Sequence, residues 1–471
     1  MTGDERPVEP SVEQPVEQPG DGSGAPTVEP RRLHPLTPPA RGWVVIAACL
    51  GVVVHNVNSG WATPGRLIIG LGVLVPLAFA YGYLSWWFTT FRIEGDDLRI
   101  DSGMVFRRTR HVRLSRLQAV DVVRPLVARL FGLAELQLQV AGGDKAEASL
   151  SYLGEADAQR LRAELLARAA GVRPDVGEAP EQPLVAVPLS AVVGSVLLSV
   201  GTWAALAPSV AILVLAFVLH ELAFVFGTLP LFLAAWQFTA GRVIRNFDFT
   251  VARSPDGLRL RHGLLEQRHQ TVPPGRVQAV RIVQPWLWRL PGWVRVEINV
   301  AGYGGRDTDA KETILLPVAP RAVAHGLLGQ ILPGVDIDAI ELIPAPRRAR
   351  WHDPVGWSAY AYGADAEVFV ARSGRFHRIL DVIPHAKVQS VRRTQGPWER
   401  RLGLATVHLD STPGPVHVRV ARRDAVEADT IVAEQAERSR TGRRGAGTER
   451  WIQGASDSSS GSASSLGEGA G

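Results

Sequence analysis

One motif occurs three times in the chain, and it constrains the fold more than any other feature of the sequence. The copies read RLQAVDVVRPLVARLFGLAEL at residues 116–136, RVQAVRIVQPWLWRLPGWVRV at 276–296 and KVQSVRRTQGPWERRLGLATV at 387–407. Equal internal spacing indicates three copies of one folding unit. Each copy repeats a Gly, a Gln, an Arg and a second Gly: Gly103, Gln118, Arg129 and Gly132; Gly263, Gln278, Arg289 and Gly292; Gly374, Gln389, Arg400 and Gly403.

Each copy has the pattern of several strands followed by one helix. The first Gly lies between two runs in which apolar and polar residues alternate, and it supplies the positive φ that a hairpin turn needs. We interpret the second Gly as the residue that closes a helical turn in the left-handed conformation. Strands followed by one C-terminal helix predict a small α+β domain. The closing helices are expected at residues 154–171, 319–334 and 422–440.

Long apolar segments precede the first two copies. Residues 43–57 and 67–88 are candidate transmembrane spans, and residues 184–238 contain Glu221 as their single charged residue. That last segment is too long for one span of about 20 residues, and Pro208 marks the expected break in it. The sequence therefore predicts two transmembrane helical hairpins, or four spans. The alternative is that these segments are buried helices of a large soluble domain.

Arginines indicate how the spans are oriented. The loops inside the two hairpins contain only Arg66, whereas the flanking segments contain Arg31, Arg32, Arg41 and Arg92. The positive-inside rule places both termini and all three repeats in the cytoplasm of a multi-pass inner-membrane (cell membrane) protein. The polar, low-complexity residues at the two ends of the chain are expected to be disordered.

These patterns divide the chain into nine segments, and the second hairpin explains why the first two copies lie farther apart than the last two. The predicted order is a Pro/Glu-rich tail (1–41), a transmembrane hairpin (42–89), a first domain (90–172), a linker (173–183), a second hairpin (184–238), a second domain (239–335), a linker (336–363), a third domain (364–438) and a Gly/Ser-rich tail (439–471).

The repeated strand (L/V)Q(A/S)V, the corner P…R(L/R)xG(L/W) and the closing helix resemble the type-two bacterial pleckstrin-homology-like (PH-like) domain. The architecture over residues 43–437 is similar to that of the YdbT-like family of bacterial membrane proteins, which carry three such domains with paired transmembrane helices. The third copy departs most, because Pro397 lies one place later and Arg401 replaces a Leu. The resemblance implies three β-barrel or sandwich domains, each with a C-terminal helix, and implies no enzyme.

The net charge and the lack of complete catalytic motifs argue against nucleic-acid binding and against enzyme activity. The sequence pI is about 9.7, but the formal charge is only +5, so we predict no nucleic-acid partner. Cys49 is the single cysteine, and Phe224 stands where an H-E-x-x-H zinc site needs its second His. Phosphate-loop and nucleophile-elbow motifs are absent from the sequence. We therefore expect no enzyme activity, no cofactor and no metal.

Basic and aromatic residues mark candidate contact surfaces. Each basic residue near an anionic leaflet contributes about 1 kcal/mol, so the arginines of the first copy are expected to contact the inner leaflet. The alternative is an ordinary solvated strand face. Exposed edge strands or aromatic grooves could instead take up a protein partner. The candidate lipid contacts are Arg107, Arg108, Arg110 and Arg113, and the candidate partner contacts, unless they pack in a core, are Trp286, Trp288, Trp293, Trp351 and Trp357.

Three ionisable residues lie inside the predicted spans, where such groups are costly and mark functional sites by default. His55 and Glu221 each lie about 12 residues into their spans, at similar depth, so we expect them to pair across the hairpins. The sequence favours a non-enzymatic inner-membrane scaffold in envelope homeostasis that binds lipid or a protein partner, or forms a homo-oligomer. The alternative is a proton-coupled transporter that uses His220 and Glu221 in an intramembrane path.

Overall fold

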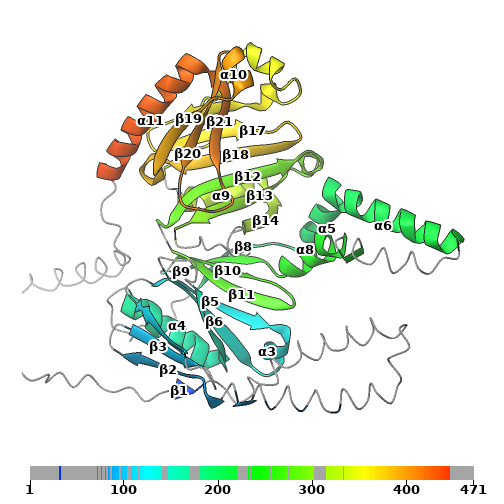
Figure 1. Cartoon of the computed structure of the whole chain (residues 1–471), viewed down its shortest axis with the longest axis vertical. Helices are drawn as coiled ribbons and strands as arrows, with labels where there is room; N and C mark the ends of the chain where they lie inside the picture. Colours follow the sequence, from blue (N-terminus) through cyan, green and yellow to red (C-terminus); the bar gives the residue numbers. More distant parts are fainter. Residues whose placement is uncertain are drawn as a thin grey trace, which may run out of the picture.

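A computed structural model describes most of the three repeats and part of the apolar segments. The described residues are 31–32, 72, 76, 80, 83–84, 87–94, 97–102, 108–114, 117–140, 147–169, 181–219, 232–233, 235–254, 257–273, 275–301, 314–332 and 334–445. Each repeat contributes four strands to one sheet and three strands to a second, and a helix follows the last strand (Figure 1). This arrangement agrees with the PH-like domains that the sequence predicts.

The first domain begins earlier in the chain than expected. Its elements are β1 (Arg31–Arg32), β2 (Thr90–Glu94), β3 (Asp97–Ser102), β4 (Arg108–Arg113), β5 (Leu117–Pro125), α3 (Leu126–Leu130), β6 (Leu133–Val140), β7 (Glu147–Gly154) and α4 (Glu155–Ala169). Strand β1 pairs with β2 through Arg31 opposite Phe91 and Arg32 opposite Thr90. The expectation that residues 1–41 form a disordered tail is therefore wrong for these two residues.

The second and third domains follow the same order of elements. The second comprises β8 (Gln182–Ala186), β9 (Thr250–Ser254), β10 (Gly257–His262), β11 (Glu266–Val272), β12 (Val277–Pro285), η3 (Trp286–Arg289), β13 (Trp293–Val300), β14 (Ile314–Pro320) and α9 (Arg321–Ile331). The third comprises β15 (Ile343–Pro344), β16 (Ala361–Ala364), β17 (Val368–Ser373), β18 (His377–Pro384), β19 (Ser390–Thr394), α10 (Pro397–Arg401), β20 (Leu404–Asp410), β21 (Val418–Asp424) and α11 (Ala425–Gly445).

The apolar helices are inserted between the first and second strands of a domain, not placed before it. In the second domain, β8 ends at Ala186 and β9 begins at Thr250, and α5 (Leu189–Leu197), α6 (Val200–Leu219) and α8 (Ala240–Arg245) lie between them. In the third domain the same connection holds only η5 (Arg347–Trp351) and η6 (Trp357–Ala359). The different lengths of this connection account for the uneven spacing of the repeats.

The predicted boundaries at 173–183, 184–238 and 336–363 are corrected for the same reason. Strand β8 occupies the end of the first linker and the start of the expected hairpin, and β15 lies inside the second linker. With two residues, β15 is too short to show a period-2 pattern, and the five residues of β8 run on into the apolar segment that predicts the hairpin. Their partners lie far along the chain, so only the folded sheet identifies them.

Helix α6 is the one described helix that is long and apolar enough to cross a membrane, with 20 residues and a mean hydropathy of 2.2. It runs through Pro208, where the sequence predicted a loop, and the break falls instead between α5 and α6, at 198–199. Proline is tolerated in apolar helices because neighbouring groups and local adjustments can satisfy the freed carbonyl, here that of Ala204. One residue further on, the Ser209 hydroxyl donates to the Ala205 carbonyl at 2.8 Å. The predicted spans at 43–57 and 67–88 lie largely outside the described residues, and four spans remain a prediction.

Adjacent domains share their sheets. Strand β5 of the first domain pairs antiparallel with β11 of the second, from Pro125 opposite Glu266 to Val122 opposite His269. Strand β12 of the second domain pairs with β18 of the third in the same way. Each pairing produces a seven-stranded sheet that runs from one domain into the next (Figure 1). The three domains therefore form one stiff array, because backbone hydrogen bonds cross both junctions.

The core also crosses the second junction. One buried cluster combines Val280, Trp288 and Leu316 of the second domain with Val370 and Val382 of the third. The first domain has a separate cluster, around Leu98, Leu136 and Leu165. The second and third domains are thus packed into one body by apolar contacts as well as by the shared sheet.

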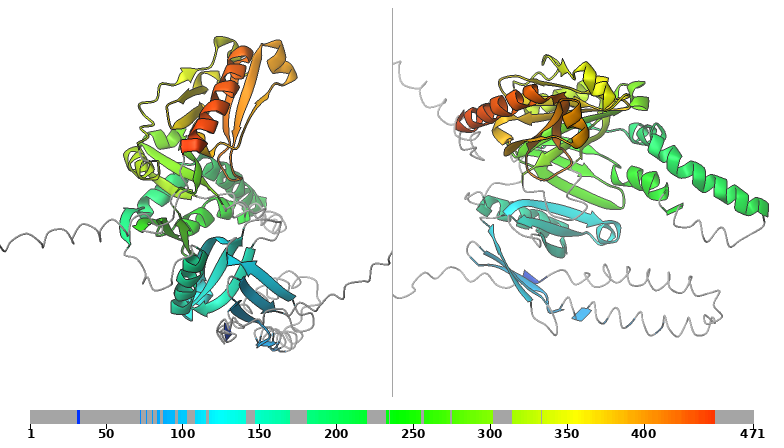
Figure 2. Two further views of the ribbon diagram at one scale, coloured as in Figure 1. Left: turned by 90° about the vertical axis from the view of Figure 1, so that its left-hand side faces the viewer. Right: turned by 45° about the horizontal axis from the view of Figure 1, so that its top comes forward.

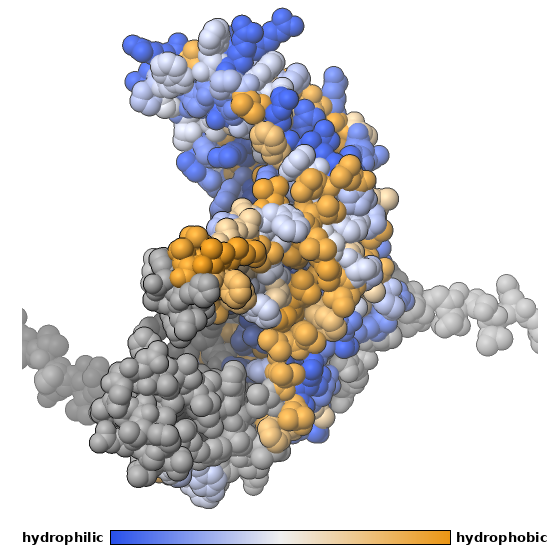
Figure 3. Space-filling view, turned by 90° about the vertical axis from the view of Figure 1, so that its right-hand side faces the viewer, coloured by the Kyte–Doolittle hydropathy of each residue, from blue (hydrophilic) through white to orange (hydrophobic). Residues whose placement is uncertain are grey.

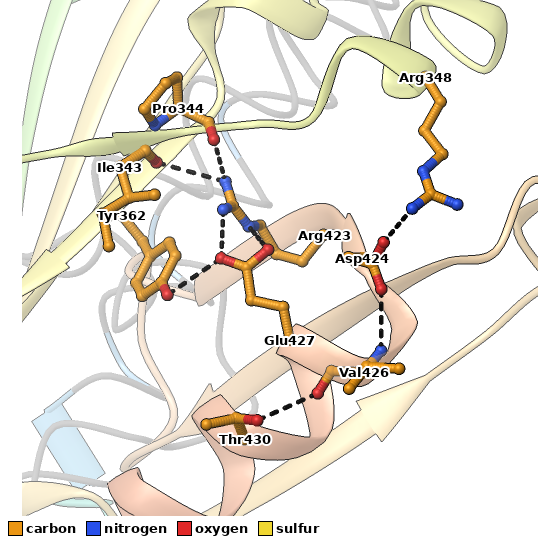
Figure 4. A network of polar contacts seen from close by, with 9 residues as sticks. All are labelled: Ile343, Pro344, Arg348, Tyr362, Arg423, Asp424, Val426, Glu427 and Thr430. Carbon is orange, nitrogen blue, oxygen red and sulfur yellow. Dashed lines mark hydrogen bonds and ion pairs between the residues drawn. The ribbon is translucent and has the colours of Figure 1, made fainter.

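A buried arginine holds β15, the first strand of the third domain, to the closing helix α11 (Figure 4). Arg423 is 2% exposed, donates to the carbonyls of Pro344 at 2.6 Å and Ile343 at 3.3 Å, and forms an ion pair with Glu427. The Tyr362 hydroxyl donates to Glu427 at 3.1 Å, and burial followed by the charge of Glu427 raises the pKa of Tyr362 to about 12. Every polar group in this cluster is satisfied, so we assign it a structural role.

The edge strands at the two ends of the array, β4 and β19, carry arginines. In the described residues, β4 and β19 each keep one unpaired edge, and they occupy the places of the strands that join the domains. The second junction places Arg281 opposite Asp381, whereas the same register between two copies of the chain would place Arg392 opposite Arg110. Like charges directly opposite destabilise a strand pair, so Arg110 and Arg392 disfavour this register, although Arg392 also forms an ion pair with Asp410.

Candidate membrane-facing site at the domain junctions

The repeated Arg and Gly form the same backbone corner in every domain. The φ angles of Gly132, Gly292 and Gly403 are 65°, 69° and 64°, the left-handed conformation that the sequence predicts. In each copy the Gly N–H donates to the carbonyl of the repeated Arg, at 3.1, 3.3 and 3.2 Å. The Gly carbonyl accepts from the first residue of the closing helix, at 3.0, 3.1 and 2.9 Å. The repeated Arg and Gly keep the same spacing in all three copies because the Gly makes hydrogen bonds to both the short helix and the closing helix.

The first Gly and the Gln of each repeat also have structural positions in the turns and strands. Gly263 and Gly374 have φ angles of 106° and 79° in the hairpin turns, while Gly103 lies outside the described residues. Gln278 is buried and its amide donates to the Arg276 carbonyl at 3.2 Å. Gln389 is exposed, and its backbone N–H donates to the backbone carbonyl of Asp410. Gln118 lies in β5. These positions do not converge on a ligand site.

The repeated arginines differ in their surroundings. Arg289 donates from Nη2 to the carbonyl of Arg375 in the next domain, at 2.5 Å. Arg129 is half-buried and Arg400 is exposed. None of the three forms an ion pair with a described residue.

The corner helices expose large apolar side chains. In α3, Leu126 is 45% and Leu130 is 82% exposed, and Phe131 follows at 43%. In the equivalent helix η3, Trp286 is 49% exposed and Leu290, just after it, is 82% exposed. Singly exposed apolar residues are ordinary, but equivalent residues exposed on two domains indicate a contact surface.

Each junction places a corner helix against the hairpin turn of the following domain. The Leu126 N–H donates to the Leu265 carbonyl at 2.6 Å, so α3 lies beside the β10–β11 turn. The Arg289 bond to Arg375 places η3 beside the β17–β18 turn. We call the exposed apolar residues at the two contacts the first knuckle (Leu126, Leu130, Phe131, Leu264 and Leu265) and the second knuckle (Trp286, Leu290 and Phe376).

The apolar helices leave the array on the same side as the first knuckle. In Figure 1, α3, the β10–β11 turn and the helices α5, α6 and α8 all lie toward the right. Figure 3 shows this side as a nearly continuous apolar band, whereas the upper part of the molecule is hydrophilic. Figure 2 shows α6 projecting well beyond the sheets. One side of the array therefore combines an apolar helix with exposed apolar side chains.

A buried tryptophan fixes the base of these helices. Trp288 in η3 is 1% exposed, and its indole N–H donates to the Ser195 carbonyl of α5 at 3.1 Å. The Arg242 guanidinium of α8 lies 5.9 Å from the centre of its ring. Helix α5 is thus anchored beside the second knuckle.

Other sequence-predicted residues are distributed as follows. Arg113 is exposed on β4, Arg108 and Arg110 belong to the same strand, and Arg107 lies outside the described residues. His55, His220 and Glu221 also lie outside them, so their pairing stays a prediction. Of the tryptophans, Trp286 and Trp351 are exposed, Trp293 and Trp357 are half-buried, and Trp288 is buried.

The knuckles were not predicted from the sequence, although the sequence contains a signal for them. The corner segments LVARLFG and WLWRLPG share an apolar residue directly after the repeated Arg, at Leu130 and Leu290. Leu130 and Leu290 belong to the corner motif R(L/R)xG(L/W), which indicates the fold and does not by itself indicate exposure. In the third copy Arg401 takes this place, and the exposed apolar residue of α10 is Trp398.

Acid is expected to weaken the first junction through His269. Burial, followed by the charges of Arg261, Arg124 and Arg162, lowers the pKa of His269 to about 4. The unfolded chain binds this proton near pH 6.5 and the folded chain does not, so stability is lost as pH falls from about 6.5 toward 4. Thermal unfolding of the full-length protein at pH 7 and pH 5 should show a smaller loss for His269→Gln than for the wild type. Equal losses would contradict the prediction.

The described residues contain no group of three His, Cys, Asp or Glu side chains placed to hold a metal ion.

The protein is similar to the UPF0699 transmembrane protein YdbT of Bacillus subtilis (strain 168), with 26% identity over 368 residues, covering 68% of this chain and 73% of the relative. No solved structure matches it. A model of the bacterial PH domain matches residues 45–169, 185–335 and 340–440. Three matches that cover most of the chain, together with three sheet-and-helix domains, show that it belongs to the bacterial PH domain family.

Proposed function

We propose that this protein is a non-enzymatic scaffold of the cytoplasmic membrane, in which three PH-like domains form a stiff array that lies on the inner leaflet. The observation that carries the proposal is the apolar band on the side from which α6 projects (Figure 3). The name of the Bacillus relative, a transmembrane protein, also supports a place at the membrane. The array then acts as a platform held parallel to the bilayer.

The composition of the knuckles suits the interface between headgroups and acyl chains. Burying a Leu or Trp side chain that water otherwise contacts contributes about 1.5–3 kcal/mol. Arg129 lies on the first corner, and Arg289 and Arg375 flank the second. Basic residues near an anionic leaflet add about 1 kcal/mol each. Apolar side chains surrounded by arginines therefore favour shallow insertion into an anionic surface.

The shared sheets make the two knuckles act together. Because both junctions are bridged by backbone hydrogen bonds, one knuckle cannot reach the bilayer without orienting the other. Linked contacts bind with a high effective concentration when the geometry allows both to engage. Weak insertion at each junction then adds up to a stable orientation of the whole array.

Insertion is expected to be visible by fluorescence quenching in nanodiscs. The full-length protein is prepared with Cys49→Ala and a single new cysteine, Leu130→Cys or Leu290→Cys, which carries an environment-sensitive dye. Lipids with a quencher on the acyl chain should quench both dyes, because apolar side chains of this kind insert about 5–10 Å. The matched control is Val426→Cys on α11, which is 75% exposed and belongs to the helix on the other side of the array (Figure 1).

Quenching at residues 130 and 290 without quenching at 426 supports the proposed orientation. If all three dyes are quenched equally, or none is, the array does not lie on this face. Replacing anionic lipid by neutral lipid is expected to reduce the quenching, because the arginines beside the knuckles then lose their partners. The transporter alternative depends on His220 and Glu221, and nothing in the described residues favours it.

A further inference from the structure

A cavity of about 550 Å³ lies between the second and third domains. Its walls come from β12 and η3, the start of α9, residues 337–342, residues 358–359 and the β17–β18 hairpin. Pockets that hold small molecules measure about 300–1,000 Å³. The cavity is therefore large enough for a ligand, and it exists only because two domains are joined.

Arginine dominates the charge of this cavity. Five arginines contribute to the lining, namely Arg289, Arg321, Arg372, Arg375 and Arg378, and Asp338 is the one carboxylate among the lining residues. That carboxylate is already engaged, because it forms an ion pair with Arg321 and lies 2.8 Å from Nδ1 of His325. The other four arginines form no ion pair with any residue that the structure describes.

One of these arginines also has an unsatisfied donor. The Nε atom of Arg289 is buried and has no hydrogen-bond partner among the described residues. Burial and the charge of Arg378 lower the pKa of Arg289, so the cation is held in unfavourable surroundings. Buried polar atoms in proteins are nearly always satisfied. An anion in the cavity would offset the repulsion between the two guanidinium groups.

Most of the remaining wall is apolar, with Gln284, His325 and Ser358 as its further polar residues. Ile282, Ile337, Ile340, Leu342, Ile379 and Leu380 line the cavity beside the arginines. Arg289 and Arg375 are chain neighbours of Leu290 and Phe376, so the cationic part lies next to the second knuckle. A ligand that fits both parts carries an anionic group and an apolar or neutral portion.

We propose that this cavity binds the phosphate group of an amphipathic or soluble phosphate ester. Guanidinium groups recognise phosphate through two parallel hydrogen bonds, and several unpaired arginines favour an oxyanion of more than one charge over a single carboxylate. The ligand comes either from an anionic phospholipid of the leaflet or from a soluble phosphate ester. The lipid source rests on the proposed function, because it requires the second knuckle to lie on the bilayer.

The experiment measures ligand-dependent thermal stabilisation of the full-length protein. In detergent micelles the probe is glycerol 3-phosphate, and in phosphatidylcholine nanodiscs the probe is added phosphatidic acid. The test variant is Arg375→Gln/Arg378→Gln, whose side chains are exposed and form no ion pair with a described residue, so the fold should persist. The control variant, Arg419→Gln/Arg438→Gln, removes the same charge from exposed positions of the third domain outside the cavity.

We expect the test variant to lose about tenfold or more in affinity and the control variant to keep wild-type affinity, since charge-assisted hydrogen bonds are lost only in the former. Stabilisation by phosphatidic acid alone identifies the lipid source, and stabilisation by a soluble probe in micelles identifies the soluble source. No stabilisation by any probe, or equal losses in the two variants, overturns the proposal. The Leu290→Cys quenching experiment is independent, so a failed cavity leaves the proposed function intact.

Discussion

Asp381→Ala is expected to lower the free energy of unfolding by about 3–5 kcal/mol, because it leaves the mostly buried Arg281 without its counter-ion. The Asp381 carboxylate accepts from Arg281 at 2.6 and 3.1 Å, and the two side chains are 5% and 18% exposed. They face each other across β12 and β18, the strands that join the second and third domains. The measurement is chemical or thermal unfolding of the purified full-length protein.

Glu297 of β13 lies opposite Arg281 and is the other carboxylate near it, but it forms its own ion pair with Arg295. Burial raises the pKa of the Asp381 carboxyl, and the hydrogen bonds and charge of Arg281 oppose that rise. Arg281 also donates to the carbonyls of Pro415 at 2.7 Å and His417 at 3.3 Å, so it connects β12 to the β20–β21 turn as well. Beside it, the Asn299 amide donates to the Val416 carbonyl at 2.8 Å. Losing the carboxylate is expected to loosen this whole contact between the domains.

Two controls separate a buried charge from a general loss of packing. The double variant Arg281→Met/Asp381→Ala removes both charges and should recover much of the lost stability. Glu437→Ala breaks an ion pair with Arg440 whose side chains are each 60% exposed, and it should cost only about 0–1 kcal/mol. A loss for Asp381→Ala as small as that for Glu437→Ala would show that the junction is not held by the buried pair.

Trp288→Ala is expected to cost about 3–5 kcal/mol, the range for removing a large buried aromatic side chain. Trp288 is 1% exposed in the core of the second domain, and it also binds α5 through the Ser195 carbonyl. The variant should therefore increase protease cleavage within residues 187–199 as well as lower the unfolding temperature. Trp288→Phe keeps most of the apolar contact and loses the hydrogen bond, for which about 0.5–1.5 kcal/mol is expected.

The control for Trp288 is a tryptophan at the equivalent corner of the third domain. Trp398 in α10 is 53% exposed, so Trp398→Ala should change the stability by no more than about 0.5 kcal/mol. If Trp288→Ala leaves cleavage of residues 187–199 unchanged while it destabilises the protein, the base of the apolar helices is held by other contacts. In that case the link between α5 and the second knuckle is wrong.

Local features of the repeat were predictable because they depend on neighbours in the sequence. The left-handed glycines at 132, 292 and 403 follow from a helical turn that must end within a few residues. The apolar character of α6 follows from composition alone. The strands β1 and β15 were not predictable, because two residues carry no pattern and each pairs with a strand beyond an insertion. The break expected at Pro208 failed because the freed backbone is tolerated within an apolar helix.

The candidate site illustrates the same division at the level of single residues. Arg289 stands out in the sequence only as a repeated residue, and its partner at Arg375 belongs to the next domain. Leu130 and Leu290 look like core positions, yet both are 82% exposed because the corner turns them outward. Asp381 and Arg281 are 100 residues apart, and no local pattern relates them.

By itself, the sequence determined that the chain repeats one α+β unit three times, that each unit turns a Gly-closed corner, and that apolar segments accompany the first two units. Only the tertiary structure decided that the hairpin of the second unit is inserted inside it, that neighbouring units share sheets, and that knuckles and a cationic cavity form where they meet. The physical reason is the distance along the chain over which each effect acts. Helix and strand propensity, apolar periodicity and turn geometry depend on residues within a few positions of one another. Strand register and charge pairing between domains depend on which distant surfaces come into contact.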